Sequence, residues 1–142
     1  MKREQKYPET KCFHYYNANY KNKISADCVV RAICTALEKS WIDTVKELTE
    51  VGIKYGTVMN ETSTYKKYLK QLGYEMQKQP RFENGGKYTG VEFCELCRKK
   101  GWKKVIAHIG GHHIVAVVDY KVYDIWDSTY KCIGNFWIIE EE

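Results

Sequence analysis

A cysteine stands where a helix is predicted to begin, in the stretch "SADCVVRAICTAL" at residues 25–37. Asp27 or Ser25 would cap this helix, and its apolar residues recur at helical spacing. A cysteine attacks as its thiolate, and the unpaired N–H groups and macrodipole of a helix N-terminus favour that charge. Cys28 lies in or next to the first turn, whereas Cys34 lies deeper in the helix. Cys28 is therefore the predicted nucleophile.

A second stretch, "GGHHIVAVVDYKVYDIWD" at residues 110–127, offers the partners that such a thiol needs. His113 opens a β-rich run and is the predicted general base. With a turn centred on Tyr120, His113 and Asp127 lie directly opposite each other, and opposed Cβ atoms are about 4.5–5.5 Å apart. Asp124 would face away in that register, but a one-residue slip reverses the preference. The prediction is Asp127 as the residue that orients His113, with Asp124 as the alternative.

Two other histidines lie close to His113 in the sequence. His112 is adjacent to it, but the alternation of a strand sends the two side chains to opposite faces, and His113 is the one that begins the apolar run. His108, at the end of the preceding β-rich run, is expected to be a hydrogen-bonded structural residue. His113 therefore remains the predicted base.

This layout resembles the papain-like cysteine peptidases, and among them the bacterial leader peptidases that process double-glycine bacteriocin precursors. The likeness rests on "DCVVRAI" for the nucleophile helix, "VIAHIGGHHIVAVV" for the histidine hairpin and "VYDIWD" for the acidic residue. Short proteins of bacteria and phages share the pattern, and the resemblance covers about half of the chain. It implies a papain-like fold, with Cys28 as nucleophile, His113 as base, Asp127 as orienter and no cofactor.

The resemblance also implies an oxyanion hole. The family usually has Gln six residues before the nucleophile, and this chain has Asn22 there, which can donate the same hydrogen bond from a shorter side chain. The backbone N–H of Cys28 would be the other donor. Two departures from the family pattern are Ile114, where an aromatic residue is usual, and "VVR" after the cysteine, where Gly is common. Arg31, one turn beyond Cys28, would favour the thiolate or bind a substrate carboxylate.

The remaining elements are read from caps and periodicity. Ser40 with Asp43, and Thr89 with Glu92, have the spacing of capping boxes, and a third helix is expected from about Thr62 to a stop at Gly73. Residues 1–24 are expected to form an irregular arm. The β-rich runs "KKVIAHI", "HIVAVVD", "KVYDIWD" and "NFWII" follow position 101 and predict an antiparallel meander. Helices first and strands last predict an α+β class, in one domain that spans residues 1–142.

Composition and charge narrow the choice of partners. The net charge of +5, from 23 Lys and Arg against 18 Asp and Glu, is spread along 142 residues without a phosphate-reading motif. "MKREQKYPET" has no apolar run after it, so no signal peptide is predicted, and no segment reaches the roughly 20 apolar residues of a membrane span. We therefore expect a cytoplasmic protein with reduced thiols, a peptide or protein substrate, and no nucleic-acid or membrane partner.

Cys94 and Cys97 form a C-x-x-C pair that raises a metal hypothesis. Tetrahedral zinc takes four ligands, and the chain has no second such pair; Cys12, His14 and Cys132 would complete a site only if the fold brought them to it. On a helix, spacing of three also places both thiols on one inward face. The buried interpretation is favoured, and neither a metal nor a cofactor is predicted.

Three functions follow, and the reactivity of the Cys28 thiol separates the first two. The favoured one is a papain-like cysteine peptidase or amidohydrolase that forms an acyl-enzyme on Cys28. The alternative is an inactive papain-like binding module, such as a phage or mobile-element effector that binds a host protein, which has no need of an activated thiol. A small zinc protein built on Cys94 and Cys97 is the third.

Overall fold

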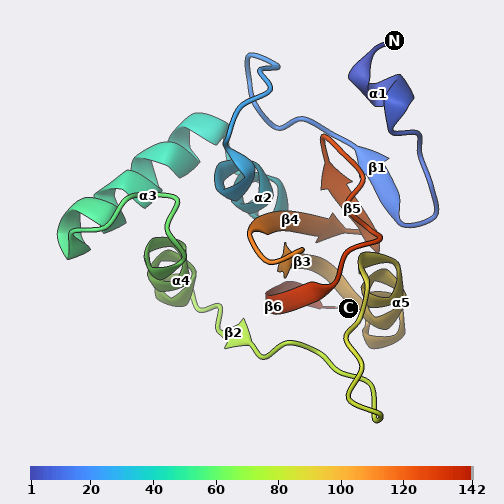
Figure 1. Cartoon of the computed structure of the whole chain (residues 1–142). Helices are drawn as coiled ribbons and strands as arrows, with labels where there is room; N and C mark the ends of the chain where they lie inside the picture. Colours follow the sequence, from blue (N-terminus) through green and yellow to red (C-terminus); the bar gives the residue numbers. More distant parts are fainter. Residues whose placement is uncertain (142) are drawn as a thin grey trace.

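A six-stranded mixed sheet lies at the centre of the computed structural model, which describes residues 1–141 and the side chains of residues 1–140 (Figure 1). The strand order is β1-β5-β4-β3-β6-β2. The strands are β1 (Phe13–Tyr15), β2 (Met76–Gln77), β3 (Trp102–Ile109), β4 (His113–Val118), β5 (Lys121–Asp124) and β6 (Ile133–Glu141). The helices within the described range are α1 (Arg3–Lys6), α2 (Cys28–Leu37), α3 (Trp41–Tyr55), α4 (Thr62–Gln71) and α5 (Gly90–Lys100). The predicted α+β class is confirmed.

The predicted helix starts are confirmed by their caps. Ser40 Oγ accepts a hydrogen bond of 3.0 Å from the N–H of Asp43 at the start of α3. Thr89 and Glu92 exchange both hydrogen bonds of a capping box at the start of α5. Helix α2 begins at Cys28 with Asp27 in the N-cap position, but the Asp27 side chain makes no capping bond there. Its carboxylate is used elsewhere.

Two apolar cores lie on the two faces of the sheet. Helices α2, α3 and α4 cover one face and α5 covers the other, on opposite sides of the strands in Figure 1. The first core includes Val30, Ile33, Leu48, Leu69, Ile106, Ile114 and Trp137. The second includes Phe13, Phe93, Cys94, Cys97, Val105, Val115 and Val117. Successive residues of β3 and β4 alternate between the two cores, as the period of a strand requires.

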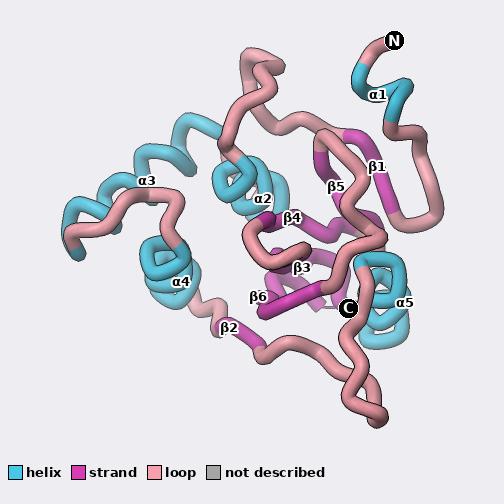
Figure 2. Tube along the Cα trace, in the orientation of Figure 1, coloured by secondary structure: helices cyan, strands magenta, loops and turns pink. Residues whose placement is uncertain are grey.

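The N-terminal segment is more ordered than predicted. It contains α1 and also β1, which pairs with β5 in parallel, from Phe13 opposite Val122 to Tyr15 opposite Asp124. Phe13 is fully buried and anchors the strand. The predicted antiparallel pairing is present among β3, β4, β5 and β6, but their order is not that of a meander, because β6 pairs with β3 and not with β5. The parallel strand β1 was not predicted, because a three-residue strand has too short a pattern to be recognised in sequence. Figure 2 shows the long loop from β1 that delivers the chain to α2.

The β4–β5 hairpin differs by one residue from the predicted register. Val118 pairs with Lys121, so the turn consists of Asp119 and Tyr120 alone, with φ values of 48° and 69°. Two successive residues with positive φ make a primed turn, whose twist matches that of the strands it joins. The register carried onward places Trp126, and not Asp127, opposite His113.

Beyond Asp124 the chain leaves the sheet and packs on the start of α5. The N–H of Gly90 donates to the carbonyl of Lys131 at 2.9 Å, and the N–H of Val91 donates to that of Thr129 at 3.1 Å. Asp127 lies in this connecting segment and not in a strand. None of the helices in residues 1–141 has the length and apolar character that crossing a bilayer requires.

Gly90→Ala should loosen this packing although alanine is the better helix former. A Cβ at position 90 would lie 2.8 Å from the Cα and 3.0 Å from the carbonyl oxygen of Thr129. We expect the free energy of unfolding to fall by about 1–3 kcal/mol, measured by urea denaturation. Val91→Ala, at an exposed position of the same turn, is the control and should change stability by about 0.5 kcal/mol or less. Equal stability of the two variants would contradict the close packing.

Candidate active site

Cys28 meets His113 where the first turn of α2 faces the start of β4. Cys28 is the first residue of α2, and its half-buried thiol lies close enough to the His113 side chain and the Ile114 backbone for both to lower its pKa. The apolar stripe of α2 packs against Ile114 and Ala116 of β4, which holds the two elements together. The predicted nucleophile and the predicted base are thus neighbours.

Asp124 holds the other side of the His113 ring. Nε2 of His113 lies 2.5 Å from Oδ2 of Asp124, the last residue of β5. Since Asp124 occupies Nε2, Nδ1 is the ring nitrogen left for an interaction with the Cys28 thiol. The Trp126 ring lies against the imidazole, with centroids 5.0 Å apart. A thiol, an imidazole and a carboxylate therefore stand in line.

Hydrogen bonds outweigh burial at both members of the Cys28–His113 pair. Burial raises the pKa of the Cys28 thiol. The interaction with His113, the Ile114 backbone and the charge of Arg31 lower this pKa by more than burial raises it, so it ends below its ordinary value. Burial lowers the pKa of His113, but the bonds to Asp124 and Cys28 raise it to about 9. These opposite shifts favour a thiolate beside an imidazolium at neutral pH.

Asp127 does not contact His113, which corrects the predicted triad. Its Oδ1 accepts hydrogen bonds from the backbone N–H of Thr129 at 2.9 Å and from the Thr129 hydroxyl at 2.5 Å. The physical reason is the hairpin register, which is set one residue from the predicted one and leaves Asp127 beyond the end of β5. Asp124 lies two residues before Trp126 and so shares its face of the strand. The alternative carboxylate is the one that the structure brings to the base.

Asn22 is not brought to Cys28 either. Its Oδ1 accepts a hydrogen bond of 3.3 Å from Asn17, and its backbone φ is 55°. Together with Lys2, Arg3, Glu4, Tyr15 and Ile24 it lines a hollow at the N-terminal segment, different from the pocket that contains Cys28. The loop before α2 turns at this left-handed residue, so counting six residues back from the nucleophile does not find an oxyanion donor.

The start of α2 itself supplies donors. The first N–H groups of a helix have no carbonyl partner within it, and the Asp27 side chain gives α2 no cap. Ala26, Cys28 and Val29 line the pocket beside the thiol, so this helix end faces open space. A carbonyl oxygen placed there would meet backbone N–H groups and the positive end of the helix dipole.

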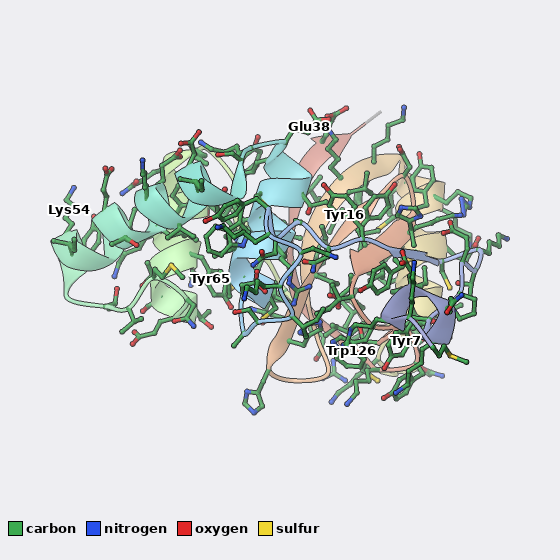
Figure 3. The ribbon with its side chains drawn as sticks, turned by 90° about the horizontal axis from the view of Figure 1, so that it is seen from above. Tyr7, Tyr16, Glu38, Lys54, Tyr65 and Trp126 are labelled. Carbon is green, nitrogen blue, oxygen red and sulfur yellow. The ribbon has the colours of Figure 1, made fainter. Side chains whose placement is uncertain are left out.

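A polar pocket borders the thiol on the side of α4. It is lined by Ala26, Cys28, Val29, Asn60, Thr62, Tyr65, His108, Gly111, His112 and Ile114. The Tyr65 hydroxyl lies 2.7 Å from Nε2 of His108 and 3.0 Å from the Thr62 hydroxyl. The expected structural role of His108 is consistent with this hydrogen bond. In Figure 3 the α2 ribbon lies between the labelled side chains of Tyr65 and Trp126.

Of the two roles predicted for Arg31, its charge does favour the Cys28 thiolate, but the side chain is not placed to bind a substrate carboxylate. It is buried, donates from Nε to Asp27 at 2.8 Å and from Nη1 to Asp124 at 2.6 Å, and is therefore unable to receive a substrate carboxylate. Sequence reasoning missed this link between α2 and β5. The signal that was present is the i, i+4 spacing of Asp27 and Arg31 on one helix face.

Cys94 and Cys97 are core residues of α5. Both are buried against the sheet with Phe93, and burial raises the pKa of each thiol. Within residues 1–141, no group of three or more His, Cys, Asp or Glu side chains is arranged to hold a metal ion. The favoured interpretation of this pair, an inward-facing helical spacing, is confirmed by its burial.

Of the four predicted site residues, the structure brings together Cys28 and His113, with Asp124 in the place expected for Asp127 and with Asn22 elsewhere. Comparisons with protein-family models, with curated proteins and with solved structures found no match to this chain. The chemistry of the site is therefore inferred from its own residues and geometry.

Cys28 should be alkylated by iodoacetamide at a pH where ordinary thiols hardly react. In His113→Ala the hydrogen bond and positive charge that lower its pKa are gone, so the rate at about pH 6.5 should fall at least tenfold. Site-resolved mass spectrometry measures the rate, with the exposed Cys132 as an internal reference whose rate stays unchanged. A Cys28 rate that is indifferent to the His113 substitution would contradict an activated pair.

Asp124→Asn and Asp127→Asn form a matched pair that tests the corrected triad. Asp124→Asn removes the negative charge that raises the pKa of His113, so the pKa of His113 should drop by at least about one unit. Asp127→Asn removes a bond to Thr129 and should leave that pKa in place. NMR titration of the His113 ring measures both. The opposite ranking of the two variants would restore Asp127 as the orienting carboxylate.

Proposed function

We propose that this protein is a papain-like thiol hydrolase, a cysteine peptidase or amidohydrolase that works through Cys28, His113 and Asp124. The observation that carries the proposal is the contact of a helix-start thiol with an imidazole whose other nitrogen is held by a buried carboxylate. A thiol that only fills space in a core needs no base and no orienting acid. The order Cys, His, Asp along the chain and the resemblance of "DCVVRAI" and "VIAHIGGHHIVAVV" to the peptidase motifs support the same class.

The reaction is acyl transfer in two stages. The Cys28 thiolate attacks the carbonyl carbon of an amide, a C–S bond forms, and the carbonyl oxygen takes the negative charge beside the N–H groups at the start of α2. The His113 imidazolium gives its proton to the leaving nitrogen, the C–N bond breaks, and the acyl-enzyme remains. His113 then takes a proton from water, the hydroxide adds to the thioester carbonyl, and the C–S bond breaks to return the thiolate.

Asp124 contributes by orientation and charge. Its bond to Nε2 directs Nδ1 at the thiol, and its negative charge stabilises the imidazolium that stands beside the thiolate and that forms again when His113 takes the proton of water. Burial of this carboxylate keeps water from competing for the same nitrogen. The proposed reaction uses no metal or cofactor, since the thiolate is the nucleophile and backbone N–H groups stabilise the oxyanion.

A peptide or protein is the proposed substrate, and the cytoplasm the proposed location, where the thiol stays reduced. The pocket beside Cys28 has hydroxyl, imidazole and amide groups on its walls, which suits an extended chain with a neutral polar side chain next to the bond that is cleaved.

Cleavage of a proteome-derived peptide library, read by mass spectrometry, tests the proposal. The wild-type protein should produce new termini and a Cys28-linked acyl adduct, whereas Cys28→Ser should produce neither. The rate on a cleaved peptide should rise with pH through the lowered pKa of Cys28 and fall above about 9, where His113 loses the proton that the leaving nitrogen needs.

The alternative to a thiol hydrolase is an inactive module that binds another protein. It predicts no new termini, no acyl adduct and a Cys28 alkylation rate equal to that of an ordinary thiol. Those three results together would exclude the hydrolase and favour a module that binds another protein through the same face.

A further inference from the structure

A buried chain of charges runs from the proposed base into the body of the helical half. His113 binds Oδ2 of Asp124, and Arg31 binds Oδ1 of the same carboxylate and one oxygen of Asp27. Arg31, Asp27 and Asp124 are 7%, 5% and 1% exposed, so these contacts are formed away from water. Such a costly arrangement of charges calls for a role beyond holding the fold.

We propose that Arg31 is the positioning residue of the site, whose guanidinium fixes the Asp124 carboxylate in the orientation that holds His113 against Cys28. The proposal rests on the proposed function for its chemical meaning. The Asp124 carboxylate is held at three points: His113 at Oδ2, and Arg31 together with the Ile125 backbone N–H at Oδ1, at 2.6 and 2.7 Å. Rotation about its side-chain bond would break all three contacts.

Because Arg31 lies on the same helix as Cys28, its bond to Asp124 fixes where α2 lies relative to β5. Arg31 lies three residues after Cys28 on the same rigid helix, and Asp124 ends β5. A bond between the guanidinium and that carboxylate therefore sets the distance between the helix that carries the thiol and the strand that carries the acid. The His113 ring lies between the two and is aligned by both.

An arginine suits this role because its donors are arranged as a planar fork. Nε points to Asp27 and Nη1 to Asp124, so one rigid group serves carboxylates from two different elements. The single ammonium of lysine has no second nitrogen with which to reproduce those two directions. The geometry therefore predicts that charge alone will not replace Arg31.

Asp27 anchors the guanidinium from behind. Its Oδ2 accepts hydrogen bonds from Asn19 Nδ2 at 3.1 Å and from Trp41 Nε1 at 2.9 Å. Burial raises the pKa of Asp27, but the bonds from Arg31, Asn19 and Trp41 bring it below its ordinary value. Asp27 gives up the capping of α2 for this role, which leaves the helix N–H groups free of a side-chain acceptor beside Cys28.

The charged and titratable groups around the site come from every element packed on it. They are Asp27, which precedes α2, Cys28 and Arg31 of α2, Tyr65 of α4, His108 of β3, His112 of the turn before β4, His113 of β4 and Asp124 of β5. The effect of a substitution at Arg31 is measured at two of these groups, as the pKa of His113 and the alkylation rate of Cys28.

The test compares Arg31→Lys with Trp41→Phe and with the control Lys39→Met. Trp41→Phe removes one donor from Asp27 and keeps an aromatic ring, while Lys39→Met breaks the Lys39–Glu47 ion pair that lies outside the network. NMR titration gives the pKa of His113, alkylation gives the rate of Cys28, and circular dichroism with thermal unfolding reports the fold of each variant.

Arg31→Lys should lower the pKa of His113 by about one unit or more, since a carboxylate that turns away no longer opposes the effect of burial. The Cys28 alkylation rate at about pH 6.5 should fall about tenfold with it. Trp41→Phe should shift both in the same direction by less, and Lys39→Met should shift neither.

A folded Arg31→Lys with the wild-type His113 pKa would overturn the proposal, because charge without the fork would then be sufficient. If Arg31→Lys does not fold, Trp41→Phe decides alone, and an unshifted His113 pKa in it overturns the proposal. If Cys28 in the wild-type protein reacts like an ordinary thiol, the proposed function is wrong. The pKa of His113 in the variants would still test the role of Arg31.

Discussion

The Asp124 carboxylate is the group on which the rest of the site depends. It is almost completely buried, and its two oxygens are shared between the imidazole of His113 and the guanidinium of Arg31. A buried charge is tolerated only when it is paired and hydrogen-bonded, and both conditions are met here by residues from two other elements, β4 and α2. The sheet and α2 are thus joined at the site by charge as well as by apolar packing.

The thiol of Cys28 shows how two opposing effects are balanced. Burial alone would raise its pKa, as it does for Cys34, whose pKa is raised to about 11 deeper in the same helix. The difference between the two cysteines comes from their neighbours. His113 and the Ile114 backbone lower the pKa of Cys28, whereas Cys34 turns its sulfur to the Arg31 carbonyl of its own helix. Position in the first turn therefore matters mainly because it exposes the thiol to β4.

The hairpin turn decides which carboxylate reaches the base. Asp119 and Tyr120 both adopt positive φ, and that two-residue turn shifts β5 by one position from the register expected for a turn centred on Tyr120. A shift of one residue exchanges the faces of a strand. Asp124 consequently faces His113, while Asp127 belongs to the segment that docks on α5.

The sequence alone determined the helix starts and singled out Cys28 and His113 as a candidate pair. Caps such as Ser40 with Asp43 act within four residues, and both Cys28 and the strand opened by His113 are recognisable from local patterns. Tertiary structure decided the rest, namely the choice of Asp124, the displacement of Asn22, the parallel strand Phe13–Tyr15 and the burial of Arg31. The physical reason is that these features depend on a register, a left-handed turn and contacts between residues as far apart as Arg31 and Asp124, none of which a local pattern specifies.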